Sequence, residues 1–303
     1  MDSFSRMIST QAIMVVYMIV GYYCSRKAII DKSTQTKLTD FVLRITLPCM
    51  VFQSFDVRLT GEVLLGASLA LGVAFLMCFL GWLAGKFLYN RYPYEKKSIL
   101  QYGTLVNNSG FLGLPIVNSV LGDEAMLLAT IFIIPNRIFM WTAGISIFTH
   151  DGDKRGAMKK VILNPCMIAV YLGLIRSFTG FMLPDFFDTA LSSLGNATTP
   201  LSMVLIGSMM TALRPGDLMD WSVVYLGIVR LLALPLICLA VMRVMGAEEM
   251  VTACSVILTA MPAGTTTALL AAKYGADAVY GTKCVLTNTL FSILTIPIIT
   301  LLT

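Results

Sequence analysis

Charged side chains are scarce in this chain of 303 residues. Asp, Glu, Lys and Arg together make up 13% of it, whereas hydrophobic residues make up 57% and the mean hydropathy is +0.80. A soluble domain usually carries about 25% charged residues, so this chain has too few to cover a water-exposed surface. The composition therefore excludes an ordinary soluble protein and predicts a polytopic membrane protein.

Long polar segments are also absent, because the connections between the apolar stretches are short. This excludes a separate soluble catalytic module and a nucleic-acid-binding module. Each apolar stretch has roughly 20 residues, enough for a helix to cross the hydrocarbon core of a bilayer. We expect an all-α fold with ten transmembrane spans, at residues 7–24, 37–55, 63–85, 98–121, 125–148, 161–180, 189–213, 221–244, 250–273 and 278–302.

Residues that usually perform catalysis or bind metals are nearly missing. The single histidine, His150, lies where span 5 meets a basic loop, and there is no HExxH motif, no pair of aspartates and no Ser/His arrangement. The seven cysteines form no CxxC motif and lie inside or at the ends of spans, where single cysteines usually act as small hydrophobic residues. We expect no enzymatic activity, no metal and no cofactor.

Basic residues are distributed unequally between the two sets of loops. One set contains Arg26, Lys27, Lys32, Lys37, Lys86, Arg91, Lys96, Lys97, Lys154, Arg155, Lys159, Lys160, Arg214 and Lys273, and the other contains Arg6, Arg58, Arg176 and Arg243. Because Lys and Arg accumulate in cytoplasmic loops, both termini are expected to face outward. The net charge of +5 then reflects membrane topology rather than nucleic-acid binding. The expected surroundings of the chain are the lipid bilayer.

The two halves of the chain resemble each other at a spacing of about 153 residues. The tetrapeptide GDEA at 122–125 parallels GADA at 275–278, NRIF at 136–139 parallels NTLF at 288–291, and Pro48 parallels Pro200. Residues 1–152 and 153–303 would each hold five spans, so the second half would enter the membrane in the opposite sense. This predicts a 5+5 inverted repeat, the architecture of many secondary transporters. The alternative is chance similarity between apolar segments.

Two spans contain polar breaks at corresponding positions of the halves. Span 4 reads LVNNSGFLGLPIV at 105–117, and span 9 reads TAMPAGTTTALL at 259–270. Asn, Ser, Gly and Pro weaken a helix, and unwound backbone within a membrane is tolerated only where it is buried or lines a wet cavity. We therefore expect two broken helices that cross near the bilayer centre.

Such a crossing has the chemistry of an anion site. A half-helix that begins after a break offers free N–H groups and about half a positive charge, which favour carboxylates. The candidate substrate-binding residues are Asn107, Asn108, Ser109, Gly110, Asn136, Arg137, Pro262, Ala263, Gly264, Thr265, Thr266, Thr267 and Asn288. The alternative is that these are packing glycines and helix-bonded threonines, which are common in membrane bundles.

The charges inside the spans are cationic: Arg44, Arg137, Arg230 and Lys283. Asp40 lies at the entrance of span 2, and its spacing of four predicts a salt bridge to Arg44. Arg137 is either a substrate contact or a clamp on backbone carbonyls, and the roles of Arg230 and Lys283 stay open. Since no acidic residue occupies a span centre, the sequence favours a small organic anion as substrate over a cation.

These motifs resemble the auxin efflux carrier family, within the bile acid/arsenite/riboflavin transporter superfamily. The family's first crossover pattern is matched by Asn108-Ser109, Leu112-Gly113 and Leu114-Pro115, and an Asn-Pro opening of span 6 by Asn164-Pro165. The stretch from Pro262 to Gly275 is similar to its second crossover. The chain lacks the long central loop of the plant exporters, so it looks like a bacterial-type member of the family. Its expected location is then the bacterial inner membrane.

The resemblance implies a transport domain, spans 3–5 and 8–10, that moves like an elevator against a scaffold of spans 1, 2, 6 and 7. It also implies a homodimer through the scaffold. The expected function is secondary active transport of a carboxylate, such as a dicarboxylate or an auxin-like acid, by alternating access. Two alternatives remain: a sodium-coupled symporter of the bile acid type, and a membrane sensor or channel that keeps the fold without turnover.

Overall fold

The protein is represented by a computed structural model, which describes residues 3–53, 55–56, 61–122, 125–148, 163, 165–212 and 220–303. In this part of the chain the regular elements are helices, and the one extended pairing is an isolated bridge. His150 and the loop residues around it lie outside the described residues.

The first half contains α1 (Ser3–Arg26), α2 (Lys32–Phe41), the π-helical turn η1 (Val42–Thr46), α3 (Leu47–Gln53), α4 (Gly61–Leu88), α5 (Tyr94–Leu105), the π-helical turn η2 (Ser109–Gly113), α6 (Leu114–Leu121), α7 (Met126–Trp141) and α8 (Ala143–Phe148). The second half contains α10 (Pro165–Thr179), α11 (Asp185–Asn196), α12 (Thr198–Met209), the 3-10 turn η4 (Met210–Ala212), α13 (Trp221–Ile228), the π-helical turn η6 (Val229–Ala233), α14 (Leu234–Val244), α15 (Glu249–Thr259), α16 (Thr266–Lys273) and α17 (Ala278–Thr300).

Four helical runs in the described residues are long and apolar enough to cross a membrane, judged by length and composition. They are Ser68–Leu88, Leu128–Phe148, Trp221–Val244 and Ala278–Thr300, and shorter apolar helices cover Ala12–Arg26, Pro165–Thr179 and Glu249–Thr259. The expectation of an all-helical, polytopic membrane protein is thus confirmed. The full set of ten spans stays a prediction.

A glycine with a positive φ follows the second part of each interrupted helix. Gly122 follows α6 with φ of 81°, and Gly275 follows α16 with φ of 74°. A positive φ is strained for residues with a side chain, so glycine is favoured at both points. These are the first residues of the GDEA and GADA tetrapeptides that align the two halves of the sequence.

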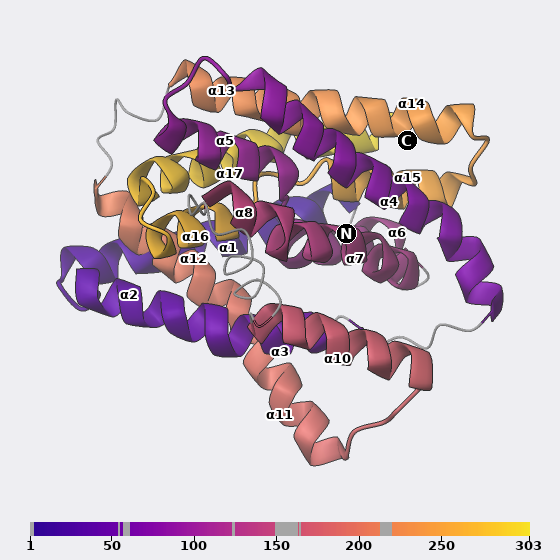
Figure 1. Ribbon diagram of the computed structural model, residues 1–303, viewed down its shortest axis with the longest axis horizontal. Helices are drawn as coiled ribbons and strands as arrows, with labels where there is room; N and C mark the ends of the chain where they lie inside the picture. The colour runs from indigo at the N-terminus through magenta and orange to yellow at the C-terminus, as the bar shows by residue number, and fades with distance from the viewer. Residues whose placement is uncertain are drawn as a thin grey trace.

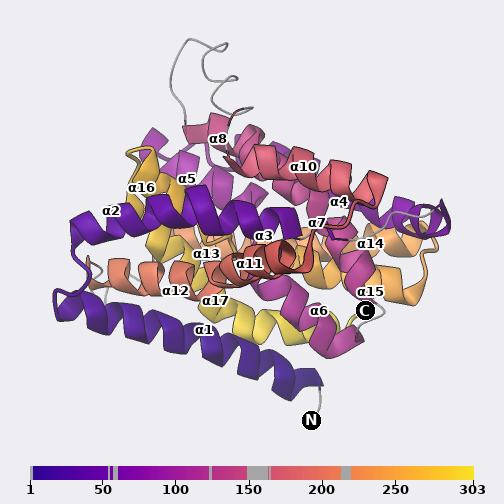
Figure 2. The same cartoon turned by 90° about the horizontal axis from the view of Figure 1, so that it is seen from below.

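Helices of one half pack against helices of the other. In Figure 2, α1 runs alongside α12, while α10 packs against α3. A Cβ atom on Gly21 would overlap with the carbonyl group of Val204, and one on Gly207 would overlap with that of Met18. The absence of side chains therefore lets the backbones of α1 and α12 approach closely, as is common between membrane helices.

The loops sort to two opposite ends of the helix bundle. In Figure 1 the turns α1–α2, α4–α5 and α16–α17 lie at the left end, whereas α10–α11 and α14–α15 connect at the right. The left end collects basic residues at helix termini: Arg26, Lys86, Lys96, Lys97 and Lys273. Among the described residues, basic side chains are therefore more numerous at this end of the bundle.

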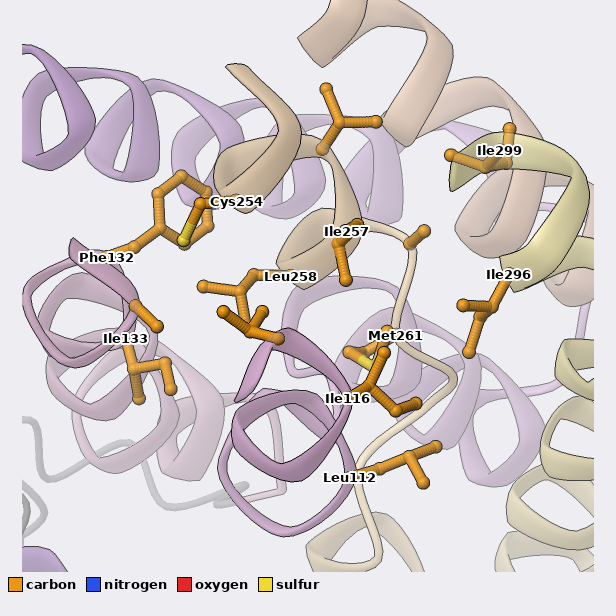
Figure 3. Close-up of a cluster of buried hydrophobic side chains, with 14 of the residues drawn as sticks. Leu112, Ile116, Phe132, Ile133, Cys254, Ile257, Leu258, Met261, Ile296 and Ile299 are labelled. Carbon is orange, nitrogen blue, oxygen red and sulfur yellow. The ribbon is translucent and has the colours of Figure 1, made fainter. Parts of the chain in front are cut away.

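A hydrophobic cluster lies beside the two interrupted helices. Figure 3 shows side chains from η2 and α6, from α7, from α15 and from α17 meeting in this cluster. Leu112 and Ile116 extend from the first interrupted helix, and Leu258 and Met261 from the second. The segment that follows α15 is thus anchored in the core rather than exposed.

The contact between α1 and α12 gives a first prediction. Replacing Gly207 with Val would place side-chain atoms against the Met18 backbone, which cannot retreat without separating the helices. We expect a loss of about 1–3 kcal/mol of stability, as is typical of overpacking. The control is Gly72→Val in α4, since a Cβ on Gly72 meets no atom within 4 Å. Thermal unfolding in detergent should show a lower Tm for the first variant only, and equal Tm values would contradict this packing.

Candidate functional site

The breaks of the two interrupted helices pair with each other. Asn107 and Ala263 form an antiparallel bridge. The Asn108 N–H donates to the carbonyl of Pro262 at 2.8 Å, and the Gly264 N–H donates to the carbonyl of Val106 at 2.9 Å. Backbone groups that lack a helical partner are costly in a membrane interior. The two irregular segments therefore satisfy part of each other's hydrogen bonding, and the structure brings the predicted breaks together.

Each break is followed by a new helical start whose first residue forms no side-chain cap. Asn108 precedes η2 and α6, and Thr265 precedes α16. Asn and Thr commonly cap helices by accepting from the backbone N–H two or three residues ahead. Here the side chains of Asn108 and Thr265 leave that role unfilled, although Asn107 Oδ1 accepts from the Ser109 N–H at 3.3 Å.

Asn136 of α7 forms hydrogen bonds to side chains of the first break. Its Nδ2 donates to Asn107 Oδ1 at 2.7 Å and to Ser109 Oγ at 2.9 Å. Asn107 in turn donates through Nδ2 to the carbonyl of Leu258, in the last turn of α15, at 2.7 Å. This chain of amides connects α7, the first break and the second interrupted helix. Asn107, Ser109 and Asn136 are thus brought together as predicted, and most of their polar atoms are already bonded.

A second group of buried polar atoms around the breaks has no hydrogen-bond partner in the described structure. It comprises Asn108 Oδ1 and Nδ2, Asn136 Oδ1, Arg137 Nε and Nη2, Thr265 Oγ1 and Thr267 Oγ1. Leaving such a group unsatisfied costs about 1–3 kcal/mol, and more when it is charged. Buried polar groups are normally paired, so a concentration of unpaired ones is a candidate ligand site.

Arg137 lies directly against the first break. Its guanidinium group occupies the space that a Cβ atom of Gly110 would need, so a side chain at position 110 would displace the guanidinium. Its side chain is buried, with 5% exposure, and among the described residues it takes part in no ion pair within 4.0 Å. An unpaired buried cation favours an anionic ligand. The alternative prediction, that Arg137 clamps backbone carbonyls, finds no hydrogen bond from Nε or Nη2 to support it.

Two predicted site residues have other contacts. Thr266 Oγ1 accepts from the Tyr102 hydroxyl at 3.0 Å and lies 3.7 Å from Met140 Sδ, so it joins α16 to α5 and α7. Asn288 donates through Nδ2 to the carbonyl of Cys284 on its own helix at 3.0 Å. No hydrogen bond among the described residues connects Asn288 to the paired breaks. Tyr102 and Met140 were not predicted, because their role depends on a long-range contact.

The sequence left the role of Arg230 open and did not place it among the candidate site residues, but the structure makes it a functional candidate. Its guanidinium donates to three backbone carbonyls at the paired breaks: Nη1 to Thr104 at 2.9 Å, Nη2 to Thr259 at 2.8 Å and Nε to Met261 at 3.2 Å. The signal that could have revealed it is an arginine inside an apolar span without an acidic residue near it. Such a side chain must find other oxygen acceptors.

The other two cations inside the predicted spans form ion pairs at the basic end. Arg44 lies 3.5 Å from Asp40, as the spacing of four predicted, and Lys273 of α16 lies 3.5 Å from the same carboxylate. Lys283 lies 3.6 Å from Asp220, which Lys96 also approaches at 3.3 Å. Arg44 and Lys283 therefore have acidic partners outside the paired breaks.

Asp220 stays ionised at physiological pH. Burial raises its pKa, but hydrogen bonds from the Ser222 hydroxyl and backbone N–H, together with the charge of Lys96, outweigh burial and lower the pKa to about 2. A carboxylate whose pKa is lowered in the folded state stabilises the fold above its unfolded pKa, here about 3.8. That stabilisation is lost only as the pH falls toward 2, so Asp220 is a fixed charge rather than a proton carrier.

Two cavities bear on access to the breaks. One of about 20 Å³ is lined by Asn107, Ser109, Asn136, Arg230 and Thr259, among others, which is room for about one water molecule. A hollow of about 650 Å³ opens at the basic end between α1 and α2 on one side and α16 and α17 on the other, with Asp40 and Lys273 in its lining. The first cavity touches the paired breaks but is too small for a carboxylate, and the larger hollow lies at the basic end.

An all-helical integral membrane protein with two helices broken and paired at corresponding positions has the construction of a transporter. The family described as "Membrane transport protein" matches residues 7–160 and 154–300. The chain therefore belongs to this family, which is the auxin efflux carrier family, and the resemblance seen in the sequence is confirmed.

Two archaeal relatives are similar along nearly the whole chain. An uncharacterized transporter of Methanocaldococcus jannaschii is 24% identical over 298 residues, which cover 94% of this chain and 95% of the relative. An uncharacterized transporter of Methanothermobacter thermautotrophicus is 24% identical over 300 residues, or 96% of this chain and 97% of the relative. Both similarities include the two interrupted helices, so they concern the complete arrangement described above.

The amide chain at the first break yields a second prediction. Replacing Asn136 with Ala removes the donor to Asn107 Oδ1 and to Ser109 Oγ. Ser109 is buried, and Asn107 Oδ1 keeps only the 3.3 Å bond from the Ser109 N–H. We expect a loss of about 1–3 kcal/mol in stability. Hydrogen exchange followed by mass spectrometry should show faster exchange in a peptide that spans 105–113.

The matched control is Asn118→Ala, at an exposed position of α6. It should leave both the Tm and the exchange of that peptide unchanged, since surface substitutions usually stay within about 0.5 kcal/mol. Unchanged exchange in the Asn136 variant would contradict the role given to this amide.

Proposed function

We propose that the protein is a secondary active transporter of a small organic anion, and that the anion binds at the paired breaks. The observation that carries this proposal is the group of unpaired polar atoms on Asn108, Arg137, Thr265 and Thr267, beside two helical starts without side-chain caps. Buried donors and a buried cation without an acidic partner are complementary to a carboxylate. A cationic substrate would meet repulsion from Arg137 instead.

The substrate contacts divide between the two breaks. Asn108 Nδ2 and the Arg137 guanidinium offer charge-assisted hydrogen bonds on the first, and the Thr265 and Thr267 hydroxyls offer donors at the start of α16. Two sets of donors suit a dicarboxylate, or a monocarboxylate with an additional acceptor group. Asn107, Ser109, Asn136 and Thr266 act as support, since their hydrogen bonds hold the segments in place.

We further propose that the chain has ten spans arranged as a 5+5 inverted repeat. Helix pairings support this. In the proposed repeat α10 is the counterpart of α1, and α12 is the counterpart of α3. Accordingly, α1 packs on α12 and α10 packs on α3. The same holds for α4 with α7 and α13 with α17. The left-handed Gly122 and Gly275 at matching positions add local support. With the basic end of the bundle in the cytoplasm, both termini face outward, as in a bacterial inner membrane.

We also propose an elevator-like motion, which the position of the large hollow supports. The hollow separates α1 and α2, which belong to the proposed scaffold, from α16 and α17 of the proposed transport domain. The ion pair between Asp40 and Lys273 bridges these two parts at 3.5 Å. Since both side chains are partly exposed, this pair contributes little energy, about 0–1 kcal/mol. It is therefore weak enough to break and re-form during each cycle.

Asn108 provides the direct test. Its side-chain amide forms no hydrogen bond in the described structure, so Asn108→Ala should change the Tm little, while transport should fall to background. A thermal-shift screen of dicarboxylates, amino-acid derivatives and indole-acetate, with and without sodium and at two pH values, identifies the ligand. Uptake and counterflow of that ligand in proteoliposomes then measure transport, with Asn118→Ala as the control.

The outcomes separate the alternatives. Uptake by the Asn108 variant at the wild-type rate would exclude this residue from the site. A wild-type protein that binds the ligand but shows no counterflow would be a sensor rather than a carrier. Loss of uptake together with a folded, stable variant supports the carrier.

A further inference from the structure

Arg230 is held by the ends of both interrupted helices. It lies in η6, where the run from Trp221 to Val244 contains a π-helical turn, and its side chain is 4% exposed. Thr104 belongs to the last turn of α5 and Thr259 ends α15, while Met261 lies in the second break. The guanidinium group therefore contacts the part of each interrupted helix that precedes its break. These three carbonyls are called the carbonyl cluster below.

The electrostatics of this arrangement are those of a cation site. The last carbonyls of a helix lack hydrogen-bond donors and carry about half a negative charge. In secondary transporters, converging carbonyls of this kind at half-helix ends coordinate a coupling cation such as Na⁺. In this chain three donors of one guanidinium, at 2.8 to 3.2 Å, occupy the carbonyl cluster. Arg suits this position because its planar group keeps its charge and offers several donors in a fixed geometry.

We propose that Arg230 is a covalently attached cation that replaces a bound inorganic cation in the carbonyl cluster. This inference rests on the proposed function, because it makes anion binding at the paired breaks independent of Na⁺. Arg230 neutralises the negative helix ends of the breaks, while the positive helix starts at Asn108 and Thr265 remain available to the substrate. It argues against the sodium-coupled symporter that the sequence left open.

The surroundings of Arg230 allow a small cation to take its place when the side chain is shortened. The cavity of about 20 Å³ that Arg230 helps to line is adjacent to the carbonyl cluster, because Thr259 lines it too. Arg230→Ala would add the volume of the guanidinium and its stem to this space. The carbonyls would remain, since they belong to the backbone. A hydrated Na⁺ or K⁺, or free guanidinium, could then bind them.

The experiment compares wild type with Arg230→Ala and Arg230→Lys in a salt series without substrate. Thermal unfolding is followed in NaCl, KCl, dilute guanidinium chloride and choline chloride at equal ionic strength, choline being too large for the cluster. The wild type should unfold at the same temperature in the Na⁺, K⁺ and choline salts. The alanine variant should have a lower Tm in choline and regain a few degrees in the small cations, by ligand linkage. The lysine variant, which keeps a tethered charge, should show no cation-specific recovery.

Arg243→Ala is the matched control. Arg243 lies on the same helical run and donates to a single exposed carbonyl, that of Leu302, at 2.7 Å. A variant at this position should show no difference between small cations and choline. Recovery there equal to that of Arg230→Ala would mean that the salts act nonspecifically, which would contradict the proposal.

Two further results would overturn the proposal. The first is a wild-type Tm, or a wild-type uptake rate, that rises specifically with Na⁺, because the cluster would then hold an ion beside Arg230. The second is an Arg230→Ala variant that folds but recovers in no small cation, which would make Arg230 a brace only. If the alanine variant fails to fold, the proposal is still tested by the other two proteins. It requires that neither the wild type nor Arg230→Lys gains Tm specifically from small cations. Since the salt series contains no substrate, its result is separate from the uptake tests of the proposed function.

Discussion

Unpaired backbone groups are the constraint on which the arrangement depends. An interrupted helix inside a membrane releases N–H and C=O groups that neither lipid nor water can satisfy. In this chain the two interruptions satisfy one another through the Asn107–Ala263 bridge and the backbone bonds of Asn108 and Gly264. Neither break has this solution alone. The pairing fixes how the two interrupted helices lie against each other, and so determines which side chains can reach the breaks.

The released groups are then sorted by charge. Carbonyls at the ends of α5 and α15 converge on Arg230, whereas the helical starts after Asn108 and Thr265 have no side-chain cap. Two consecutive residues of α7 also contact the first break. Asn136 donates a hydrogen bond to it, and Arg137 lies beside Gly110 with donors unpaired. An excess of positive potential at the breaks results, and it is the physical reason for proposing an organic anion as substrate.

Much of this organisation could be predicted from the sequence, and the failures have a common cause. Local composition revealed the breaks, because Asn, Ser, Gly and Pro interrupt apolar spans at both NNSG and MPAG. It also gave the Asp40–Arg44 pair, which is four residues apart. The bond from Arg230 to Thr104, the bond from Tyr102 to Thr266 and the bond of Asn288 to its own helix were not predictable. These depend on contacts across more than a hundred residues, or on which face of a helix meets its neighbour.

The most direct measurement of the central claim is a cryo-electron microscopy structure with the transported anion bound. The account predicts a carboxylate within hydrogen-bonding distance of Asn108 Nδ2 and of the Arg137 guanidinium, next to the start of α16, with Arg230 still bonded to its carbonyls. A carboxylate that binds away from both breaks, with Asn108 and Arg137 still unpaired, would contradict it.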